Sequence, residues 1–326
     1  MIADVTPMGT PSGRRARYAL ALAATLAFIP ALGFAQSYPS KPVQILVPFP
    51  AGTVVDTMAR TFAQLVEPKF GQRPLVINRE GGSFTIAMAA AAAAPADGYT
   101  VAMSPHTPLT IQLLRMKNLP YKRDTFIGLC QTYELTFFIA TGPNSPFKDI
   151  RSVIEHARTN PGKLRYGTSG IATVLHLTGA ELWQRAGVRI SDVPYKSEAL
   201  FIPNLMAGEI ELGVVATAYA LKLRPLLVFA EHRLPGRPDI PTATELGYPV
   251  RPSGFGGLFV RADTPVPVVE RLEAACREAL SDPVYKQAAE RQYLASDYLG
   301  RVAFTARVNE EYESKARLLR SLDLLE

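Results

Sequence analysis

Short apolar runs alternate with longer runs of helical periodicity from Pro42 onward. The short runs have the length of buried strands, and the longer ones place apolar residues three and four positions apart, as a helix with one buried face does. In the first half of the chain, strands are expected at residues 43–49, 75–78, 100–103, 126–134 and 136–141. Helices are expected at residues 56–70 and 84–94. This alternation is typical of βα units with a mostly parallel sheet.

A turn rich in glycine and proline at residues 142–146 predicts a crossing into a second lobe. In this lobe, strands are expected at residues 164–167, 190–193, 212–216 and 226–230, and helices at residues 149–159, 171–186 and 197–207. Pro203 is expected to break the last of these helices. After a proline-rich loop at residues 235–252, the pattern predicts a return near residues 255–260 and two final helices at residues 266–280 and 304–319.

The chain is therefore predicted to leave one lobe and come back to it. We expect an α/β fold of two lobes, each a mostly parallel sheet flanked by helices, with a cleft between them where a ligand binds. Lobe 1 is expected to contain residues 36–141 and 258–326, and lobe 2 residues 142–257.

The first 35 residues differ from the rest. Arg14, Arg15 and Arg17 precede an apolar run over residues 19–35, which ends in small residues of the kind that a signal peptidase reads. The run is too short for a membrane span of about 20 residues. We predict a signal peptide over residues 1–35, cleaved after Ala35, and therefore an exported protein; the secretory and twin-arginine routes both remain open.

Charge and composition limit the classes of partner. The chain of 326 residues is 48% hydrophobic and 20% charged, with a net charge of +6. Residues 1–35 contain three Arg and one Asp, so 32 basic and 28 acidic residues remain without them, a net charge of +4. This mild excess suits a small anionic ligand and is too weak and too scattered for a nucleic-acid surface.

The two cysteines do not have the spacing of a metal site. Cys130 lies in an expected strand and Cys276 in an expected helix. We expect each to be a buried apolar residue rather than half of a disulfide, although an exported protein would permit the bond. Neither metal ligands nor cofactor motifs occur at the required spacing, so no metal and no cofactor is expected.

Two expected loops end on helix N-termini, which favour anions through unpaired backbone N–H groups and the helix dipole. In the first, Gly52, Thr53 and Val54 offer backbone donors, and Asp56 is interpreted mainly as a cap that shapes the loop. The second loop has the same arrangement ahead of its helix. Its candidate ligand residues are Thr168, Ser169, Gly170 and Thr173.

Four further residues have two interpretations each. His176 either donates to the ligand or is a satisfied histidine on the inner face of its helix. Phe49 and Tyr195 are either apolar walls of the site or ordinary packing residues. Lys196 is interpreted as a surface or hinge charge rather than a counter-ion for the ligand.

Many short motifs, taken together in their order and spacing, resemble those of one known family. The chain is similar to the extracytoplasmic solute receptors of tripartite tricarboxylate transporters, the Bug proteins. The matching segments lie at residues 38–42, 47–52, 59–60, 78–82, 97–100, 119–121, 160–170, 176–177, 193–196, 207–210, 237–242 and 245–247.

The resemblance implies a type II periplasmic binding protein without catalytic activity, which holds an organic anion between its lobes. It implies that the loop from Phe49 to Asp56, including Ala51, binds one ligand carboxylate and that residues 168–173 bind another. The segment around Tyr195 would form a further wall. The implied partners are integral membrane transporter subunits, and the receptor is expected to be a monomer.

Three departures from the family pattern are present. Ala51 stands where the family has proline, and Gly52 is followed by Thr53 where the family has further glycine, which narrows the loop. Ser197 stands where glycine is customary. Between Val215 and Leu227 the chain is shorter than its relatives, so part of a lobe surface is expected to be missing.

Other functions fit the sequence less well. Residues 167–171 resemble a nucleophile elbow, but Ile171 occupies the place of the required glycine, so a hydrolase is not expected. We predict a periplasmic receptor for a small organic carboxylate. A periplasmic sensor that feeds a membrane signalling protein, or a divergent receptor with a non-carboxylate ligand, stays open as the alternative.

Overall fold

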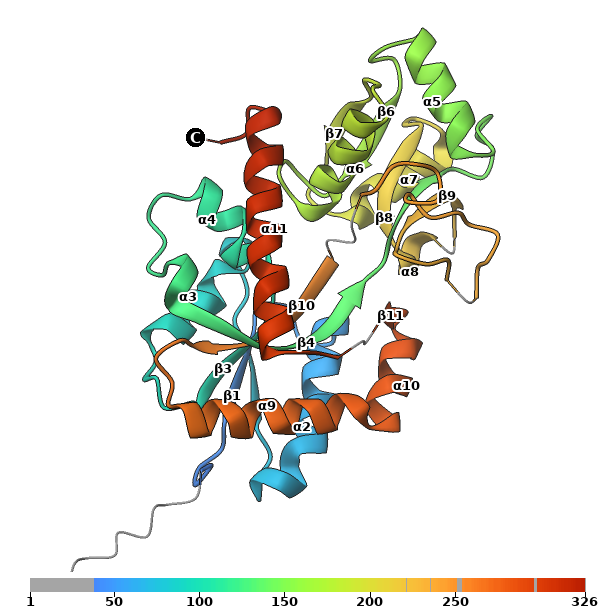
Figure 1. Cartoon of the computed structure of the whole chain (residues 1–326). Helices are drawn as coiled ribbons and strands as arrows, with labels where there is room; N and C mark the ends of the chain where they lie inside the picture. Colours follow the sequence, from blue (N-terminus) through green and yellow to red (C-terminus); the bar gives the residue numbers. More distant parts are fainter. Residues whose placement is uncertain (1–37, 221, 235, 251–253, 296–297, 326) are drawn as a thin grey trace, which may run out of the picture. The chain divides into compact units, whose positions relative to one another are not determined.

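In the computed structural model, two separate β-sheets with helices packed on them make up most of the chain (Figure 1). The structure describes residues 38–220, 222–234, 236–250, 254–295 and 298–325. Both sheets belong to the unit that begins at Lys41. The predicted signal peptide, residues 1–35, lies outside the described residues.

The first sheet has the strand order β11-β4-β10-β3-β1-β2, and β12 pairs with β4. The strands are β1 (Gln44–Val47), β2 (Leu75–Asn78), β3 (Thr100–Pro105), β4 (Phe126–Leu135), β10 (Gly254–Arg261), β11 (Leu294–Ala295) and β12 (Leu299–Gly300). Strand β1 pairs in parallel with β2 and β3, whereas β10 runs antiparallel to β3 and β4.

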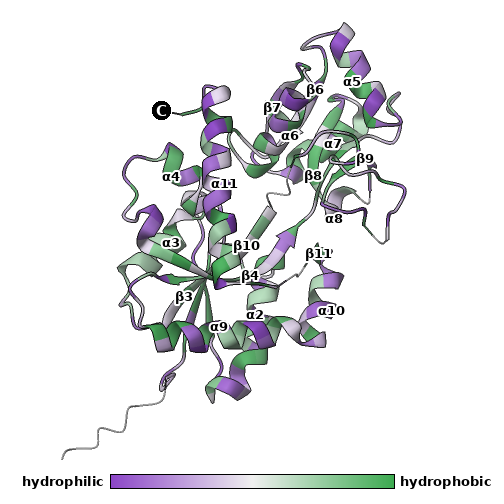
Figure 2. Cartoon of the chain, in the orientation of Figure 1, coloured by the Kyte–Doolittle hydropathy of each residue, from purple (hydrophilic) through white to green (hydrophobic). Residues whose placement is uncertain are grey.

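Helices cover this sheet and bury its apolar side chains. They are α2 (Val54–Phe70), α3 (Thr85–Ala93), α4 (Ile111–Arg115), α9 (Val266–Ser281), α10 (Pro283–Arg291) and α11 (Arg301–Ser321), with short 3-10 turns η1 (Gly82–Phe84), η2 (Thr107–Leu109) and η3 (Arg123–Thr125). Figure 2 shows that the strands are mainly hydrophobic and that α11 carries many hydrophilic residues. Phe304 of α11 is fully buried against Phe255 and Phe259, which fixes this helix on the sheet.

The second sheet has the strand order β7-β6-β8-β5-β9. Its strands are β5 (Phe137–Thr141), β6 (Arg165–Thr168), β7 (Ser191–Pro194), β8 (Leu212–Ala216) and β9 (Arg224–Phe229). Its helices are α5 (Ile150–Thr159), α6 (Val174–Arg185), α7 (Glu198–Ala207) and α8 (Thr217–Ala220). A buried core containing Tyr166, Trp183 and Val214 joins α6 to the strands.

Both sheets are mixed, and in this detail the expected mostly parallel pairing is corrected. Strands β6, β7 and β8 are parallel, but β5 runs antiparallel to β8 and β9. The strands next to the crossings between the sheets, β4, β5, β9 and β10, all pair antiparallel, as do the short strands β11 and β12 with β4.

The chain changes sheets at Thr136, between β4 and β5, and returns between Phe229 and Gly254. Residues 137–141 therefore pair in the second sheet and residues 254–257 in the first, which differs from the expected lobe boundaries at 141 and 258. The predicted strands at residues 126–134 and 136–141 follow one another almost directly, and no glycine or proline between them marks this change of sheet.

Most predicted elements are present, with local differences. Helix α7 continues through Pro203 instead of breaking there. Helix α6 begins at Val174 rather than 171, because Ala172 has a φ of 55° and the segment before it forms a turn. Helices α4, α8 and α10 were not predicted.

Cys130 and Cys276 form a disulfide, so the expectation of two unpaired cysteines is wrong. Helix α9 packs on β4, and this places the two buried residues opposite each other with their Cα atoms 6.6 Å apart. A separation of 146 residues along the chain left no local signal for the pair.

Candidate ligand-binding site

The loop between β1 and α2 is shaped by the buried carboxylate of Asp56. Asp56 is 2% exposed, and its Oδ2 accepts hydrogen bonds from the Gly52 backbone N–H and from Arg60 Nε, both at 2.9 Å. Asn78 Nδ2 donates to Asp56 Oδ1 at 2.8 Å and to the Phe49 carbonyl at 2.9 Å. The carboxylate thus connects the loop, the first turns of α2 and the end of β2.

These contacts set the charge of Asp56. Burial alone would raise the pKa of the carboxyl, but the hydrogen bonds from Arg60, Gly52 and Asn78 together lower the pKa below its ordinary value. Asp56 is therefore ionised at neutral pH. Because its oxygens are occupied by protein donors, the side chain acts as an internal support of the loop in this geometry.

The backbone donors of the first loop divide into two groups. The Gly52 N–H points to Asp56, and the Thr53 N–H makes a long contact of 3.4 Å with the Pro50 carbonyl. Helix α2 begins after Thr53, whose side chain does not cap it. Within the described part of the chain, the N–H groups of Val54 and Val55 have no hydrogen-bond partner, so they remain available to an anion.

An apolar surface lies beside this loop. The partly buried rings of Phe49 and Phe84 are 4.7 Å apart, and Ile86 is 48% exposed. Phe84 has a φ of 76°, a left-handed conformation that is uncommon for a bulky residue. The sequence analysis named Phe49 but not Phe84, since nothing in the sequence shows that the two rings meet.

The second loop, between β6 and α6, is closed by side-chain hydrogen bonds. Thr173 is the N-cap of α6: its Oγ1 donates to the Gly170 carbonyl at 2.8 Å and accepts from the His176 N–H at 3.3 Å. Ser169 Oγ donates to the same hydroxyl at 3.4 Å. The buried Thr168 Oγ1 accepts from the Gly170 N–H at 3.4 Å.

His176 lies behind this loop and is 6% exposed. Its Nδ1 accepts a hydrogen bond from the Ala172 N–H at 3.0 Å, so Nε2 carries the proton, and Nε2 lies 3.9 Å from Asp192 Oδ2. Burial lowers the pKa of the imidazole and Arg115 lowers it further, while Asp192 raises it. Both ring nitrogens face protein groups, and we interpret the residue as a support of the second loop.

Tyr195 joins the same loop from β7. Its N–H donates to the Thr168 carbonyl at 2.9 Å. The Tyr195 carbonyl oxygen lies close to Gly170, since a Cβ placed on Gly170 would be 3.6 Å from this oxygen. The hydroxyl accepts from Asn204 Nδ2 at 2.9 Å, and the ring packs on Phe201. The structure therefore brings together the predicted residues 168–176 and Tyr195.

Glu198 is a residue of this region that the sequence analysis missed. It is the first residue of α7, and its Oε1 accepts a hydrogen bond from the Ala216 N–H at 2.7 Å. Burial raises the pKa of the carboxyl to about 7, and the Ala216 hydrogen bond opposes this only partly. An acidic residue in the first turn of a helix usually makes a favourable contact with the helix dipole at the surface. The partial burial of Glu198 was therefore not foreseeable from the sequence.

The second loop lies on the side of its sheet that contacts the first lobe. Ala172 and Leu177 share a buried apolar cluster with Ile111 of α4 and with Leu318 and Leu319 of α11. Among the described residues, no hydrogen bond or ion pair joins the first loop to the second. The two groups of predicted residues are thus each assembled, but they do not touch.

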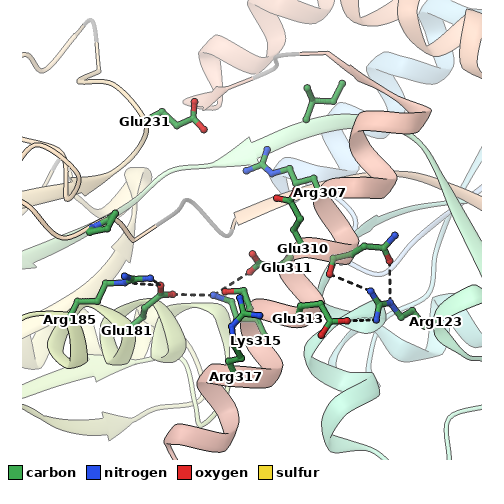
Figure 3. A pocket seen from close by; sticks show the side chains of 14 residues that line it. Arg123, Glu181, Arg185, Glu231, Arg307, Glu310, Glu311, Glu313, Lys315 and Arg317 are labelled. Carbon is green, nitrogen blue, oxygen red and sulfur yellow. Dashed lines mark hydrogen bonds and ion pairs between the residues drawn. The ribbon is translucent and has the colours of Figure 1, made fainter.

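A cavity of about 760 Å³ lies elsewhere, between α11 and residues of the second lobe (Figure 3). Its charged side chains largely pair with one another: Lys315 lies between Glu311 and Glu181, and Arg123 binds Glu313. The predicted ligand residues are not part of its described lining. Because most of its charged side chains already pair within the protein and the predicted ligand residues do not line it, we place the candidate site at the two loops and not in this cavity.

Two further features, a metal site and a membrane-spanning helix, are absent from the described residues. No group of three or more His, Cys, Asp and Glu residues there could hold a metal ion. No helix of that part of the chain is long and apolar enough to cross a membrane.

Comparison with known sequences identifies one family. The family described as "Tripartite tricarboxylate transporter family receptor" (TctC) matches residues 58–323. A protein of Pseudomonas sp. strain P51 is 32% identical over 260 residues, which is 76% of either chain. Protein BugT of Bordetella pertussis is 30% identical over 224 residues, 66% of this chain and 68% of its own.

Solved structures agree with this match. A TctC solute-binding protein from Polaromonas is 26% identical, with a TM-score of 0.77 over 87% of this chain and 100% of its own. Two proteins of Rhodopseudomonas palustris are each 23% identical to this chain. The one solved with adipate has a TM-score of 0.74 over 88% of this chain and 99% of its own. The one solved with malate has a TM-score of 0.70 over 86% of this chain and 100% of its own. Together with the two sheets, these likenesses confirm the predicted two-lobed type II fold.

Proposed function

Because the chain belongs to the tripartite tricarboxylate transporter receptor family, we propose that it captures a small organic carboxylate between its two lobes. Members of this family are solute-binding receptors and not enzymes. They are periplasmic binding proteins, and we propose the same location for this chain after removal of residues 1–35.

The observation that carries the proposal is the pair of loops that end on helix N-termini at the carboxyl ends of β1 and β6. The free N–H groups of Val54 and Val55 in the first lobe are donors for one carboxylate. The loop from Thr168 to Thr173 in the second lobe is the candidate partner for another polar end. The adipate and malate bound to two structural neighbours support a carboxylate as the ligand class.

The side chains around the first loop refine the ligand class. Phe49, Phe84 and Ile86 offer apolar surface next to the free donors. A ligand with an apolar body and one or two carboxylates would bury this surface, whereas a citrate-like molecule with three charges would not. We therefore propose a mono- or dicarboxylate with a hydrocarbon or aromatic body.

Delivery to a membrane transporter completes the proposed role. Closure of two lobes on a solute is the usual motion of two-lobed binding proteins and presents a new surface to a partner. We propose that integral membrane transporter subunits recognise the loaded receptor. A role as a ligand sensor would predict that deletion of the gene leaves solute uptake unchanged, which a radiolabelled uptake assay tests.

The binding test is isothermal titration of protein expressed from its full chain, unfolded and refolded to remove any co-purified ligand. The panel contains adipate, malate, benzoate, citrate and amino acids. We expect micromolar binding of a mono- or dicarboxylate and weaker binding of citrate. If refolded protein with cooperative unfolding binds none of the acids, the proposed carboxylate function is wrong.

A further inference from the structure

We propose that Glu198 contacts the bound ligand and, as a neutral carboxylic acid, donates a hydrogen bond to one of its carboxylate oxygens. This inference rests on the proposed function, because it assigns a specificity-determining residue to the same site. It makes ligand capture dependent on pH in a way that backbone donors alone do not.

The position of Glu198 supports a ligand contact. Its Oε1 accepts from the N–H of Ala216, which ends β8 and pairs with Phe137, directly after the crossing residue Thr136. The carboxyl ends of the parallel strands β6, β7 and β8 meet at this edge of the sheet, where the predicted ligand residue Thr168 also lies. Ligands of α/β proteins bind outside the carboxyl ends of parallel strands.

Among the residues that the structure describes, the Glu198 carboxyl makes no ion pair, and its one hydrogen bond is that from the Ala216 N–H. The ionisable groups on its own and the neighbouring elements are Lys196 and Tyr195 in the preceding loop, Arg165 and Tyr166 on β6, Asp192 on β7, Tyr219 in α8 and Glu209 after α7. Strands β5 and β8 carry none. Arg165 is bound to Glu211 and the Tyr195 hydroxyl to Asn204, so neither neutralises Glu198.

Glu198 is partly buried, and a partly buried carboxyl without a counter-ion favours its neutral form. Burial raises the pKa of Glu198 to about 7, so the group is protonated at pH 6 and mainly ionised at pH 8. The neutral form offers one O–H donor to an anion, whereas the ionised form would repel it. A ligand carboxylate would therefore select the protonated form, with the proton taken from solvent when binding occurs at pH 8.

The size of the effect follows from this titration. With a pKa near 7 in the free protein, the protonated fraction falls by about tenfold between pH 6 and pH 8. The dissociation constant should rise by the same factor. The carboxyl groups of benzoate and malate titrate below pH 6, and the lowered pKa of His176 moves the titration of its imidazole away from pH 8.

Glu198→Gln is the diagnostic variant. Its amide oxygen can still accept from Ala216, and its NH2 group can donate to the ligand at any pH. Glu198→Ala removes both interactions. Glu209→Gln is the matched control, because it removes an exposed carboxylate just after the same helix.

The experiment is titration of the wild type and the three variants, each expressed from the full chain, with adipate, malate and the other acids of the panel. Measurements at pH 6 and pH 8, in two buffers of different ionisation enthalpy, give affinity and proton uptake together. We expect the wild type and Glu209→Gln to bind about tenfold more weakly at pH 8 and to take up nearly one proton there. Glu198→Gln should bind equally at both pH values without proton uptake, and Glu198→Ala should bind at least tenfold more weakly than the wild type at pH 6.

Each other outcome has a defined meaning. If Glu198→Gln keeps the wild-type pH dependence, or Glu198→Ala binds like the wild type, the inference is overturned while the proposed function stands. Tighter binding of an amine-bearing ligand at pH 8, lost in Glu198→Gln, would assign Glu198 an ionised role and also overturn it. If the wild type binds no acid at either pH, the proposed function itself fails.

Discussion

The buried carboxylate of Asp56 accepts a hydrogen bond from the backbone N–H of Gly52, four residues earlier, at 2.9 Å. Gly52 has a φ of 82°, so the loop turns back on the start of α2 in a conformation that glycine adopts without strain. This contact uses a donor that the sequence analysis assigned to the ligand. It leaves the next N–H groups, those of Val54 and Val55, in a fixed position.

Asp56→Asn should destabilise the protein and weaken ligand binding. An amide supplies one acceptor where the carboxylate receives bonds from Gly52, Arg60 and Asn78, so at least one donor would face an NH2 group. We expect the free energy of unfolding to fall by about 1.5–3 kcal/mol, as for buried hydrogen bonds to a charged group. Urea denaturation at pH 7 measures it.

The matched control for Asp56 is Glu67→Gln, an exposed acid on the same helix, which should change stability by less than about 0.5 kcal/mol. Because the pKa of Asp56 is lowered in the folded state, its contribution is present above the ordinary value of 3.8 and is lost as the pH falls through the folded pKa. The gap between the wild type and Asp56→Asn should therefore narrow in acid. A gap that stays constant down to pH 2 would contradict the role of the charge.

The pH dependence of stability should also report on His176. Its pKa is lowered in the folded state, mainly by burial, so the unfolded chain binds more protons and stability falls as the pH drops below the ordinary value of 6.5. His176→Gln keeps an acceptor for the Ala172 N–H without the titration. Its stability should be less sensitive to a change from pH 7.5 to pH 5.5 than that of the wild type.

His156→Gln serves as the control for this comparison, because His156 is exposed. The raised pKa of Glu198 acts in the opposite direction: its contribution is present at low pH and is lost as the pH rises through about 7. The wild type, His176→Gln and His156→Gln all retain Glu198, so differences between their pH profiles of stability report on His176. Parallel pH profiles for His176→Gln and the wild type would rule out a titrating role for this histidine.

The disulfide should contribute substantially to the stability of the first lobe. Cys130 and Cys276 enclose a loop with a sequence separation of 146, for which the chain-entropy estimate is about 5 kcal/mol, and native disulfides usually contribute about 2–5 kcal/mol. We expect the double variant Cys130→Ala/Cys276→Ala to lose an amount in this range in urea denaturation. The oxidised wild type should show no free thiol under denaturing conditions; two reactive thiols would contradict the bond.

The order of the elements and the position of the two loops could be predicted from the sequence, because residues that end helices and strands, such as glycine and proline, stand at the ends of the apolar runs. Strands β2 and β8 have the predicted limits, since the residues on either side end them clearly. The place of Asp56 in the first turn of α2 led to its interpretation as a cap that shapes the loop, and its hydrogen bond from the Gly52 N–H is compatible with that interpretation. Helix α10 was overlooked although Asp282 and Pro283 form a recognisable start, with Asp282 capping the Val284 N–H.

Features that depend on distant contacts could not be predicted in the same way. The Phe49–Phe84 pair and the disulfide join residues that meet only after the sheets form. The environment of Glu198 depends on the end of β8, and a neutral carboxyl differs from an ionised one only through its surroundings. Sequence patterns fix local conformation, whereas burial and pairing are tertiary properties.

An ion pair between the lobes supplies the last prediction. Lys315 of α11 is 2% exposed, and its Nζ lies 3.3 Å from Glu311 and 3.6 Å from Glu181 of α6 (Figure 3). Lys315→Met would leave two carboxylates without this cation, although Arg185 still binds Glu181. Breaking a buried pair in this way costs about 3–5 kcal/mol, so we expect a loss of at least about 2 kcal/mol in the free energy of unfolding.

A double-mutant cycle of Lys315→Met and Glu181→Gln separates this contact from the loss of burial, because it isolates the coupling of the two residues. We expect a coupling energy of about 1–3 kcal/mol, against less than about 1 kcal/mol for a control cycle on the exposed pair Arg123 and Glu313. Since α6 carries the second loop at its start, loosening this contact should also change ligand affinity in the single variant. Equal coupling in the two cycles would mean that Lys315 does not link α11 to α6 in solution.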